Sequence, residues 1–428
     1  MNSTLNTQSS VVKIVKQNSA FSLLVNGLPF VVKGAGVGDT SKIVSLANAG
    51  GNSFRTWSTD DAEQQLALAK EHGLMVALGF DFGKELFGFD YNNEAEVKAQ
   101  FERIKDDVQK YKNHPNLLCW VVANEPNLLF DKQGNLDFVN PKVYDAIEQV
   151  VRYIHQNDPN HPVTYTFAGI EPEHVKVALE RTPSIDFVSV QVYGLLEQLH
   201  PLLQQAKIEK PVMVTEYGPV GHWEMPATTW GREIEEPSWV KAQNLKTRIE
   251  QNIIDDPSGL VIGNYVFYWG QKQERTPTWY GMFTKDNLAT SSVDVMSEIW
   301  TEKTPRHQAP KVVAITLNDH HPIDSVYLMP ATINSAQLVV DAINLENLKF
   351  SWQLLREVDE RSDGGAFEAE PPKLEFTMLN QYQSSFLAGR IEFICPKEPG
   401  EYRLFGYVKD KMGKVGYANF PFYVSPSQ

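Results

Sequence analysis

The sequence predicts an α/β fold in which a (β/α)8 TIM barrel is followed by a small all-β sandwich of the immunoglobulin type. Short apolar runs alternate with helical patterns about every 20 to 30 residues as far as residue 302, as successive βα units require. The pattern then changes to alternating apolar runs separated by turn residues, which is typical of an antiparallel sandwich. A chain of 428 residues is long enough for both domains.

We expect a polar N-terminal segment at residues 1–19, the barrel at residues 20–304 and the sandwich at residues 308–428. Three glycines, at positions 34, 36 and 38, do not have the spacing of a dinucleotide-binding loop, so we interpret them as a tight first turn of the barrel. The eight barrel strands are expected at residues 30–33, 53–57, 74–78, 117–123, 163–167, 186–192, 212–215 and 260–267. The main sandwich strands are expected at residues 312–317, 336–343, 350–355, 389–395, 401–410 and 417–424.

Composition excludes several classes of function. The net charge of −14, with Lys and Arg scattered along the chain, argues against nucleic acid or an anionic membrane as a partner, and no apolar run is long enough to cross a bilayer. No signal-peptide pattern is present, so we expect a cytoplasmic protein or an exported one whose signal has been removed. Cys119 and Cys395 lie in different predicted domains, and we expect no disulfide, metal or other cofactor.

Two carboxylates are the catalytic candidates. The stretch KNHPNLLCWVVANEPN, residues 112–127, contains a strand expected to be buried on both faces, and Glu125 follows its end. The stretch VMVTEYG, residues 212–218, ends in the same way on Glu216. Their separation of 91 residues corresponds to three βα units of about 30 residues, so both should emerge at the C-terminal face, where barrels keep their chemistry.

Two facing carboxylates about 5 to 5.5 Å apart are the equipment of a retaining glycosidase. We expect Arg55, at the end of the second strand, to pair with Glu216 and keep it ionised, although a purely structural salt bridge is the alternative. Indoles in the predicted loops should face sugar rings, apart from one or two that pack: Trp57, Trp223, Trp230, Trp269 and Trp279. The polar groups expected to bind sugar hydroxyls are Asn124, Tyr193 and Tyr268.

The stretch at residues 112–127 resembles the acid/base segment of glycoside hydrolase family 2, and its Ala-Asn-Glu-Pro sequence is shared with family 5 and the wider clan A. The stretch at residues 212–218 resembles the nucleophile strand of the same clan. The resemblance covers about residues 20–302 and implies a retaining mechanism. It implies that Glu125 is the acid/base and Asn124 its preceding asparagine, that Glu216 is the nucleophile, that Arg55 is the strand-two arginine, and that Trp269 is the aromatic under the reacting sugar.

The chain departs from the family pattern at Gln191, two residues before Tyr193, where relatives often have His or Asn. The sequence RTW at residues 55–57 also resembles the β-mannanases of family 5. We therefore expect a retaining β-glycosidase that hydrolyses β-linked oligosaccharide or polysaccharide of the β-glucan or β-mannan type. A transglycosylase acting on β-glucan and a catalytically silent carbohydrate-binding protein are the alternatives, and the oligomeric state stays open.

Overall fold

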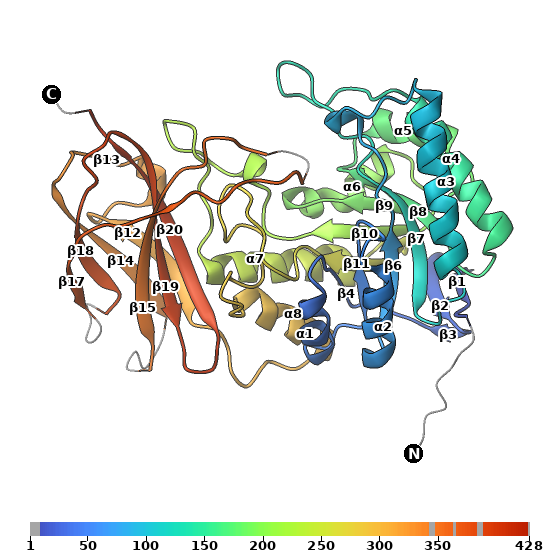
Figure 1. Ribbon diagram of the computed structural model, residues 1–428. Coiled ribbons are helices and arrows are strands. Elements are labelled where there is room, and N and C mark those ends of the chain that lie inside the picture. Colours follow the sequence, from blue (N-terminus) through green and yellow to red (C-terminus); the bar gives the residue numbers. More distant parts are fainter. Residues whose placement is uncertain (1–8, 342–346, 363–364, 383–387, 427–428) are drawn as a thin grey trace. The chain divides into compact units, whose positions relative to one another are not determined.

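The computed structural model describes residues 9–341, 347–362, 365–382 and 388–426 (Figure 1). The chain forms two compact units. The first comprises Met1–Tyr217 and Arg248–Trp269, and the second comprises Gly218–Thr247 and Gly270–Gln428. None of the helices in the described ranges is both long and apolar enough to traverse a lipid bilayer.

The first unit contains a closed barrel of eight parallel strands, which confirms the predicted TIM barrel. Their order around the barrel is β10-β11-β4-β5-β6-β7-β8-β9. The strands are β4 (Gly34–Gly36), β5 (Ser53–Arg55), β6 (Met75–Gly79), β7 (Leu117–Asn124), β8 (Val163–Ala168), β9 (Val188–Gln191), β10 (Val212–Tyr217) and β11 (Val261–Val266). Between them lie the helices α1 (Ile43–Asn48), α2 (Ala62–His72), α3 (Glu94–Tyr111), α4 (Lys142–Asn157), α5 (Pro172–Arg181) and α6 (Leu199–Gln205), with the short 3-10 helices η1 (Thr40–Lys42), η2 (Glu85–Phe87) and η3 (Gly194–Gln198) and the π-helix η5 (Glu250–Ile254).

The first barrel strand differs from its prediction. Residues 30–33 precede it, and two of the three glycines interpreted as a turn, Gly34 and Gly36, belong to the strand β4 itself, which is paired with β5 and β11. A Cβ atom on Gly34 would lie 2.4 Å from the ring of Tyr265, and one on Gly36 would lie 2.7 Å from the indole of Trp57. Only glycine leaves room for these two aromatic side chains, so the glycines serve packing and not a turn.

An antiparallel sheet that was not predicted precedes the barrel. It consists of β1 (Val12–Gln17), β2 (Ala20–Val25) and β3 (Leu28–Pro29). Val12 and Leu23 join the same core cluster as Leu118 and Met213 from the first residues of β7 and β10, so the sheet covers the N-terminal ends of barrel strands. β1 lies in the predicted polar segment, of which residues 1–8 fall outside the described part of the chain.

The second unit contains the predicted sandwich, which is confirmed. One sheet has the strand order β12-β14-β18-β17 and the other β13-β20-β19-β15-β16. The strands are β12 (Lys311–Leu317), β13 (Tyr327–Leu328), β14 (Ile333–Asp341), β15 (Lys349–Arg356), β16 (Lys373–Leu374), β17 (Met378–Tyr382), β18 (Arg390–Ile394), β19 (Gly400–Lys409) and β20 (Val415–Val424), with the turn η6 (Pro322–Asp324). The six predicted runs fall on β12, β14, β15, β18, β19 and β20, except that residues 342–343 lie outside the described residues.

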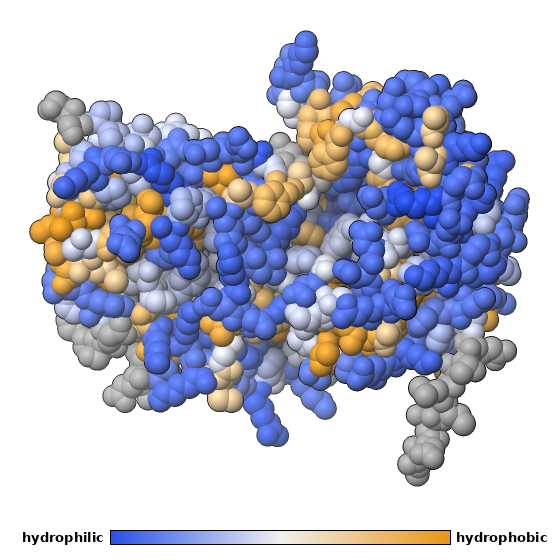
Figure 2. All heavy atoms as spheres, viewed as in Figure 1, coloured by the Kyte–Doolittle hydropathy of each residue, from blue (hydrophilic) through white to orange (hydrophobic). Residues whose placement is uncertain are grey.

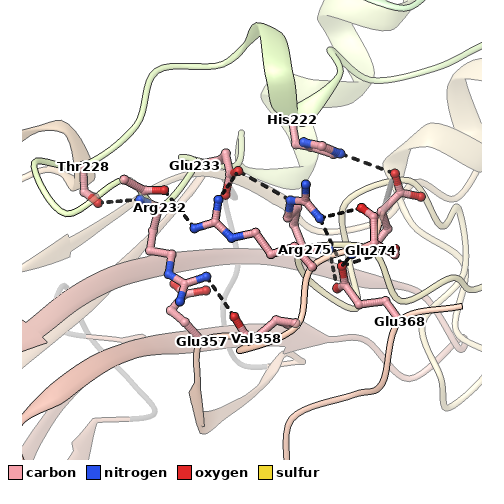
Figure 3. Close-up of polar contacts among 12 residues, drawn as sticks. His222, Thr228, Arg232, Glu233, Glu274, Arg275, Glu357, Val358 and Glu368 are labelled. Atoms are coloured by element: carbon pink, nitrogen blue, oxygen red, sulfur yellow. Dashed lines mark hydrogen bonds and ion pairs between the residues drawn. The ribbon is translucent and has the colours of Figure 1, made fainter. Parts of the chain in front are cut away.

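The second unit also contains the segments that follow β10 and β11, with η4 (His222–Glu224), α7 (Ser238–Ile249), which ends in the first unit, and α8 (Ser291–Thr301). Charged side chains tie these segments to the sandwich (Figure 3). Arg275 Nη1 is 3.2 Å from the buried carboxylate of Glu368, and Arg232 Nη1 donates to the carbonyl of Val358 (2.9 Å). The two segments and the sandwich therefore form one compact body, and a boundary at residues 304–308 remains a prediction.

A buried ion pair also lies in the second unit, and breaking it should destabilise this unit. Lys241 Nζ is 2.6 Å from Glu235 Oε1, with side-chain exposures of 5% and 0%, and Lys241 also donates to the Tyr417 hydroxyl (3.2 Å) on β20. Lys241→Met leaves a buried carboxylate without its cation, so we expect a loss of about 3 to 5 kcal/mol in the free energy of unfolding, measured by denaturant titration.

Lys409→Met is the matched control, because Lys409 forms an ion pair with Asp286 in which the side chains are 34% and 65% exposed. Such a pair contributes about 0 to 1 kcal/mol. Equal denaturation midpoints for the two variants would contradict the role assigned to Lys241.

Candidate active site

Glu125 occupies an unusual backbone position immediately after β7. Its φ angle is +51°, in the left-handed region that residues other than glycine seldom adopt. Two hydrogen bonds to β8 hold it there, because the Glu125 amide donates to the carbonyl oxygen (3.0 Å) and to Oγ1 (3.1 Å) of Thr166. The side chain is 15% exposed. A non-glycine residue fixed in this conformation at the C-terminal end of a barrel strand is typical of a functional site.

Glu216 lies within β10, and four side chains donate hydrogen bonds to its carboxylate. Oε1 accepts from Arg55 Nη1 (2.9 Å), Trp57 Nε1 (2.9 Å) and Gln191 Nε2 (3.0 Å), and Oε2 accepts from the Tyr193 hydroxyl (3.0 Å). The Glu216 side chain is 8% exposed. An ionised carboxylate can only accept hydrogen bonds, so four donors are suitable partners for it. Together they fix the positions of both of its oxygens.

Arg55 joins the ends of three strands. Its side chain is fully buried, and Nη1 contacts the carbonyl of Thr215 (3.1 Å) as well as Glu216. Nη2 donates to Asn124 Oδ1 (2.8 Å), the residue before Glu125. Because the amide oxygen of Asn124 turns to the guanidinium, its Nδ2 group is left to donate elsewhere. The predicted Arg55–Glu216 pair is therefore present, and the same cation orients the predicted asparagine.

The two carboxylates influence each other electrostatically. Burial raises the pKa of Glu125 above its ordinary value, and the negative charge of Glu216 raises it further. The positive charges of Lys84 and Arg55 oppose this rise without cancelling it. A carboxyl group with a raised pKa is suited to act as an acid, and a neighbouring carboxylate held by four donors is suited to act as a nucleophile.

Trp57 reaches the site through its indole nitrogen. It was predicted to face a sugar ring, but its N–H donates to Glu216 Oε1, and its ring lies edge-on to Phe267 at 5.8 Å between centroids. The sequence places Trp57 at the end of the second strand but gives no sign that its N–H points to Glu216.

Trp57→Phe separates hydrogen bonding from stacking, because it keeps a ring and removes the donor. A hydrogen bond to a charged group contributes about 1.5 to 3 kcal/mol, so kcat/KM should fall roughly 10- to 100-fold. Trp352→Phe is the control, since Trp352 Nε1 has no hydrogen-bond partner among the described residues. An unchanged kcat/KM in Trp57→Phe would assign the indole to stacking.

The prediction that Trp269 lies under the reacting sugar is wrong. The side chain is fully buried, and its Nε1 donates to Ser45 Oγ (3.0 Å). Strand β11 ends at Val266, so the alternation of a strand no longer directs the side chain of Trp269. Phe267 lies at the site instead, with its ring centroid 5.8 Å from Trp57 and 6.2 Å from Tyr193.

The remaining predicted aromatics are distributed over both units. The Tyr268 hydroxyl accepts from the amide of Gly38 (3.1 Å), which ties it to the segment after β4. Trp223 belongs to the second unit, where it is 60% exposed and lies edge-on to His222. Substrate contacts of Tyr268 and Trp223 remain predictions. Trp279 is buried, and the ring of Trp230 packs against Tyr327 and Tyr423 of the sandwich, so both of these indoles pack, as does Trp269, which was expected under the sugar.

Like Phe267, two polar residues at the site were not among the predicted ones. Gln191 Nε2 donates toward Asn124 Oδ1 (2.6 Å) and Glu216 Oε1 (3.0 Å), so it bridges the ends of β7 and β10. Its place at the end of β9 could have identified it. Lys84 Nζ lies 3.4 Å from Glu125 Oε2 and comes from a loop without any sequence signal. Within the part of the chain that the structure describes, no three His, Cys, Asp or Glu side chains gather as a metal site requires.

This chain is similar to known glycoside hydrolases. Residues 39–233 match the family described as glycosyl hydrolases family 2, TIM barrel domain. A β-glucuronidase of Paenibacillus borealis is 24% identical over 321 residues, which are 65% of this chain and 50% of that protein. A probable mannan endo-1,4-β-mannosidase C of Aspergillus terreus is 32% identical over 100 residues, 22% of this chain and 25% of that one.

The crystal structure of Ruminococcus gnavus β-glucuronidase has the same fold, with a TM-score of 0.51 at 17% identity over 70% of this chain and 54% of that one. The chain therefore spans about half, or less, of the length of the proteins it matches.

Proposed function

We propose that this chain, whose residues 39–233 match the TIM barrel domain of the glycosyl hydrolases family 2, is a retaining β-glycosidase that hydrolyses β-linked oligosaccharide or polysaccharide. The observation that carries the proposal is the contrast between the two carboxylates. Glu216 is held by four donors, while burial raises the pKa of Glu125. A nucleophile and an acid are the two groups that a double displacement requires.

In the first step, Glu216 attacks the anomeric carbon and Glu125 gives its proton to the glycosidic oxygen. Oε2 is the attacking atom, because it accepts one hydrogen bond from Tyr193 whereas Oε1 accepts three. The bond from the anomeric carbon to the leaving oxygen breaks as the ester bond to Glu216 forms. The leaving sugar departs as a neutral alcohol, and Glu125 is left as a carboxylate.

In the second step, the Glu125 carboxylate takes a proton from water, and the water oxygen attacks the same anomeric carbon. The ester bond to Glu216 breaks, and its carboxylate returns to the four donors that held it before. Two inversions at one carbon leave the product with the configuration of the substrate. The Asn124 Nδ2 group, freed because Arg55 and Gln191 both bind its oxygen, is the donor that we assign to a sugar hydroxyl.

We propose that the substrate is a β-linked sugar. β-Glucan and β-mannan are the sequence-based expectations, and the names of the relatives add β-glucuronides to the candidates. The test is a panel of these three β-linked classes, with product sizing and with NMR detection of the first anomer released. We expect at least one class to be cleaved to the β-anomer. An α-anomer as first product, or no cleavage of any class, would refute the proposal, and longer products at high acceptor concentration would indicate transglycosylation.

A further inference from the structure

The candidate acid, Glu125, has a second cationic neighbour besides Arg55. Lys84 comes from the loop between β6 and η2, and its Nζ lies 3.4 Å from Glu125 Oε2. The side chains of Lys84 and Glu125 are only 11% and 15% exposed. Water and salt screen such a shielded pair far less than a surface pair, so the ammonium acts on this carboxyl group directly.

The same ammonium lies over an exposed aromatic ring. Lys84 Nζ is 5.6 Å from the ring centroid of Phe87, at the end of η2. Phe87 is 57% exposed although its side chain is large and apolar. A partly open ring beside a cation and an acid has the form of a surface against which the apolar face of a sugar stacks.

A hydrogen bond fixes this loop to the one that follows β7. The amide of Asn140 donates to Glu85 Oε2 (2.6 Å), so η2 is anchored two residues before Phe87. The second loop carries Phe138, which is 55% exposed and lies 4.1 Å from the ring of His174 on α5. Figure 2 shows hydrophobic residues, in orange, at the surface near the position that α5 has in Figure 1. The exposed rings are thus displayed on anchored loops.

The position of the acid decides which part of a substrate these residues meet. A general acid protonates the glycosidic oxygen, which departs with the leaving sugar, so groups gathered around the acid face that sugar. Resting on the proposed function, we propose that residues 80–93 form the leaving-group subsite. In this subsite, Lys84 positions Glu125 and Phe87 stacks against the leaving sugar.

The first test is the pH profile of kcat/KM for Lys84→Met. The charged groups that face Glu125 are Lys84, Arg55 and Glu216, and the variant removes only the first. Because the ammonium lowers the pKa of Glu125, its loss should move the basic limb to higher pH, and Lys84→Arg should restore it. The control is Lys16→Met, since Lys16 lies over the ring of Phe21 (5.0 Å) in the sheet at the other end of the barrel.

The second test compares leaving groups in Phe87→Ala. A β-linked disaccharide has a leaving sugar that can stack on Phe87, whereas the β-glycosyl fluoride of the same sugar has none. We expect kcat/KM to fall about 2- to 10-fold for the disaccharide and to stay unchanged for the fluoride. Val31→Ala is the control, because Val31 is 74% exposed and precedes β4 at the opposite end of the barrel.

The outcomes are distinguishable. The subsite alone is overturned if the wild-type protein is active but Lys84→Met keeps the original pH profile. The same holds if Phe87→Ala lowers kcat/KM equally on both substrates. A wild-type protein that cleaves neither substrate would overturn the proposed function and the subsite with it.

Discussion

Replacing Glu216 by alanine is expected to lower kcat on the order of 10⁵-fold or more, the scale at which loss of a covalent nucleophile acts in other hydrolases. In the proposed mechanism no covalent intermediate can form without this carboxylate, because the neighbouring Glu125 is assigned to proton transfer. The measurement is turnover of the best substrate of the panel, with circular dichroism to establish that the variant is folded.

Azide makes the test specific. A small anion can occupy the space left by the missing carboxylate and attack the anomeric carbon directly, so Glu216→Ala should yield a glycosyl azide of inverted configuration. Glu63→Ala is the control, because the side chain of Glu63 is 83% exposed on α2. Turnover at the wild-type level in Glu216→Ala would remove this residue from the mechanism.

Replacing Glu125 by alanine should lower kcat/KM about 10²- to 10⁴-fold for substrates with a sugar leaving group, the usual contribution of a general acid. Substrates with a dinitrophenolate leaving group need no proton, so they should still form the glycosyl-enzyme, which then accumulates. Azide should release that intermediate as a glycosyl azide of retained configuration, the opposite of the product expected from Glu216→Ala.

The pH profile supplies a second readout for the same variant. Because burial raises the pKa of Glu125, the wild-type protein should keep its protonated acid to a higher pH than an exposed glutamate would. Activity should fall as the pH rises through that pKa, and Glu125→Ala should lose this basic limb. Equal losses on sugar and dinitrophenyl substrates would contradict the role of Glu125 as an acid.

The sequence was sufficient for the barrel and for the two carboxylates because both depend on regular spacing. Apolar runs at βα intervals predict parallel strands, and a carboxylate after such a strand must emerge at the C-terminal face. Arg55 could be paired with Glu216 by the same reasoning, because it also stands at a strand end.

The rest depends on contacts that no local pattern encodes. The indole N–H of Trp57 donates to Glu216, and no local pattern distinguishes this indole from the others in the predicted loops. Trp269 is buried beyond the end of β11, where its amide donates to Gly36 and its indole donates to Ser45. Lys84 lies on a loop, where sequence gives neither direction nor partner. The strand β4 was misread because glycine usually marks a turn, whereas here it makes room for aromatic neighbours.

Arg55 fixes Glu216 and Asn124 to the barrel strands and not to the loops. One guanidinium binds groups on β7 and β10 from its own place on β5, so the relative placement of the reacting groups is set by the barrel wall. Loops other than the one that carries Lys84 can then diverge by insertion or exchange without moving Glu216 or Asn124. We therefore infer that the proposed chemistry depends mainly on the barrel strands, and that substrate preference can change through the other loops.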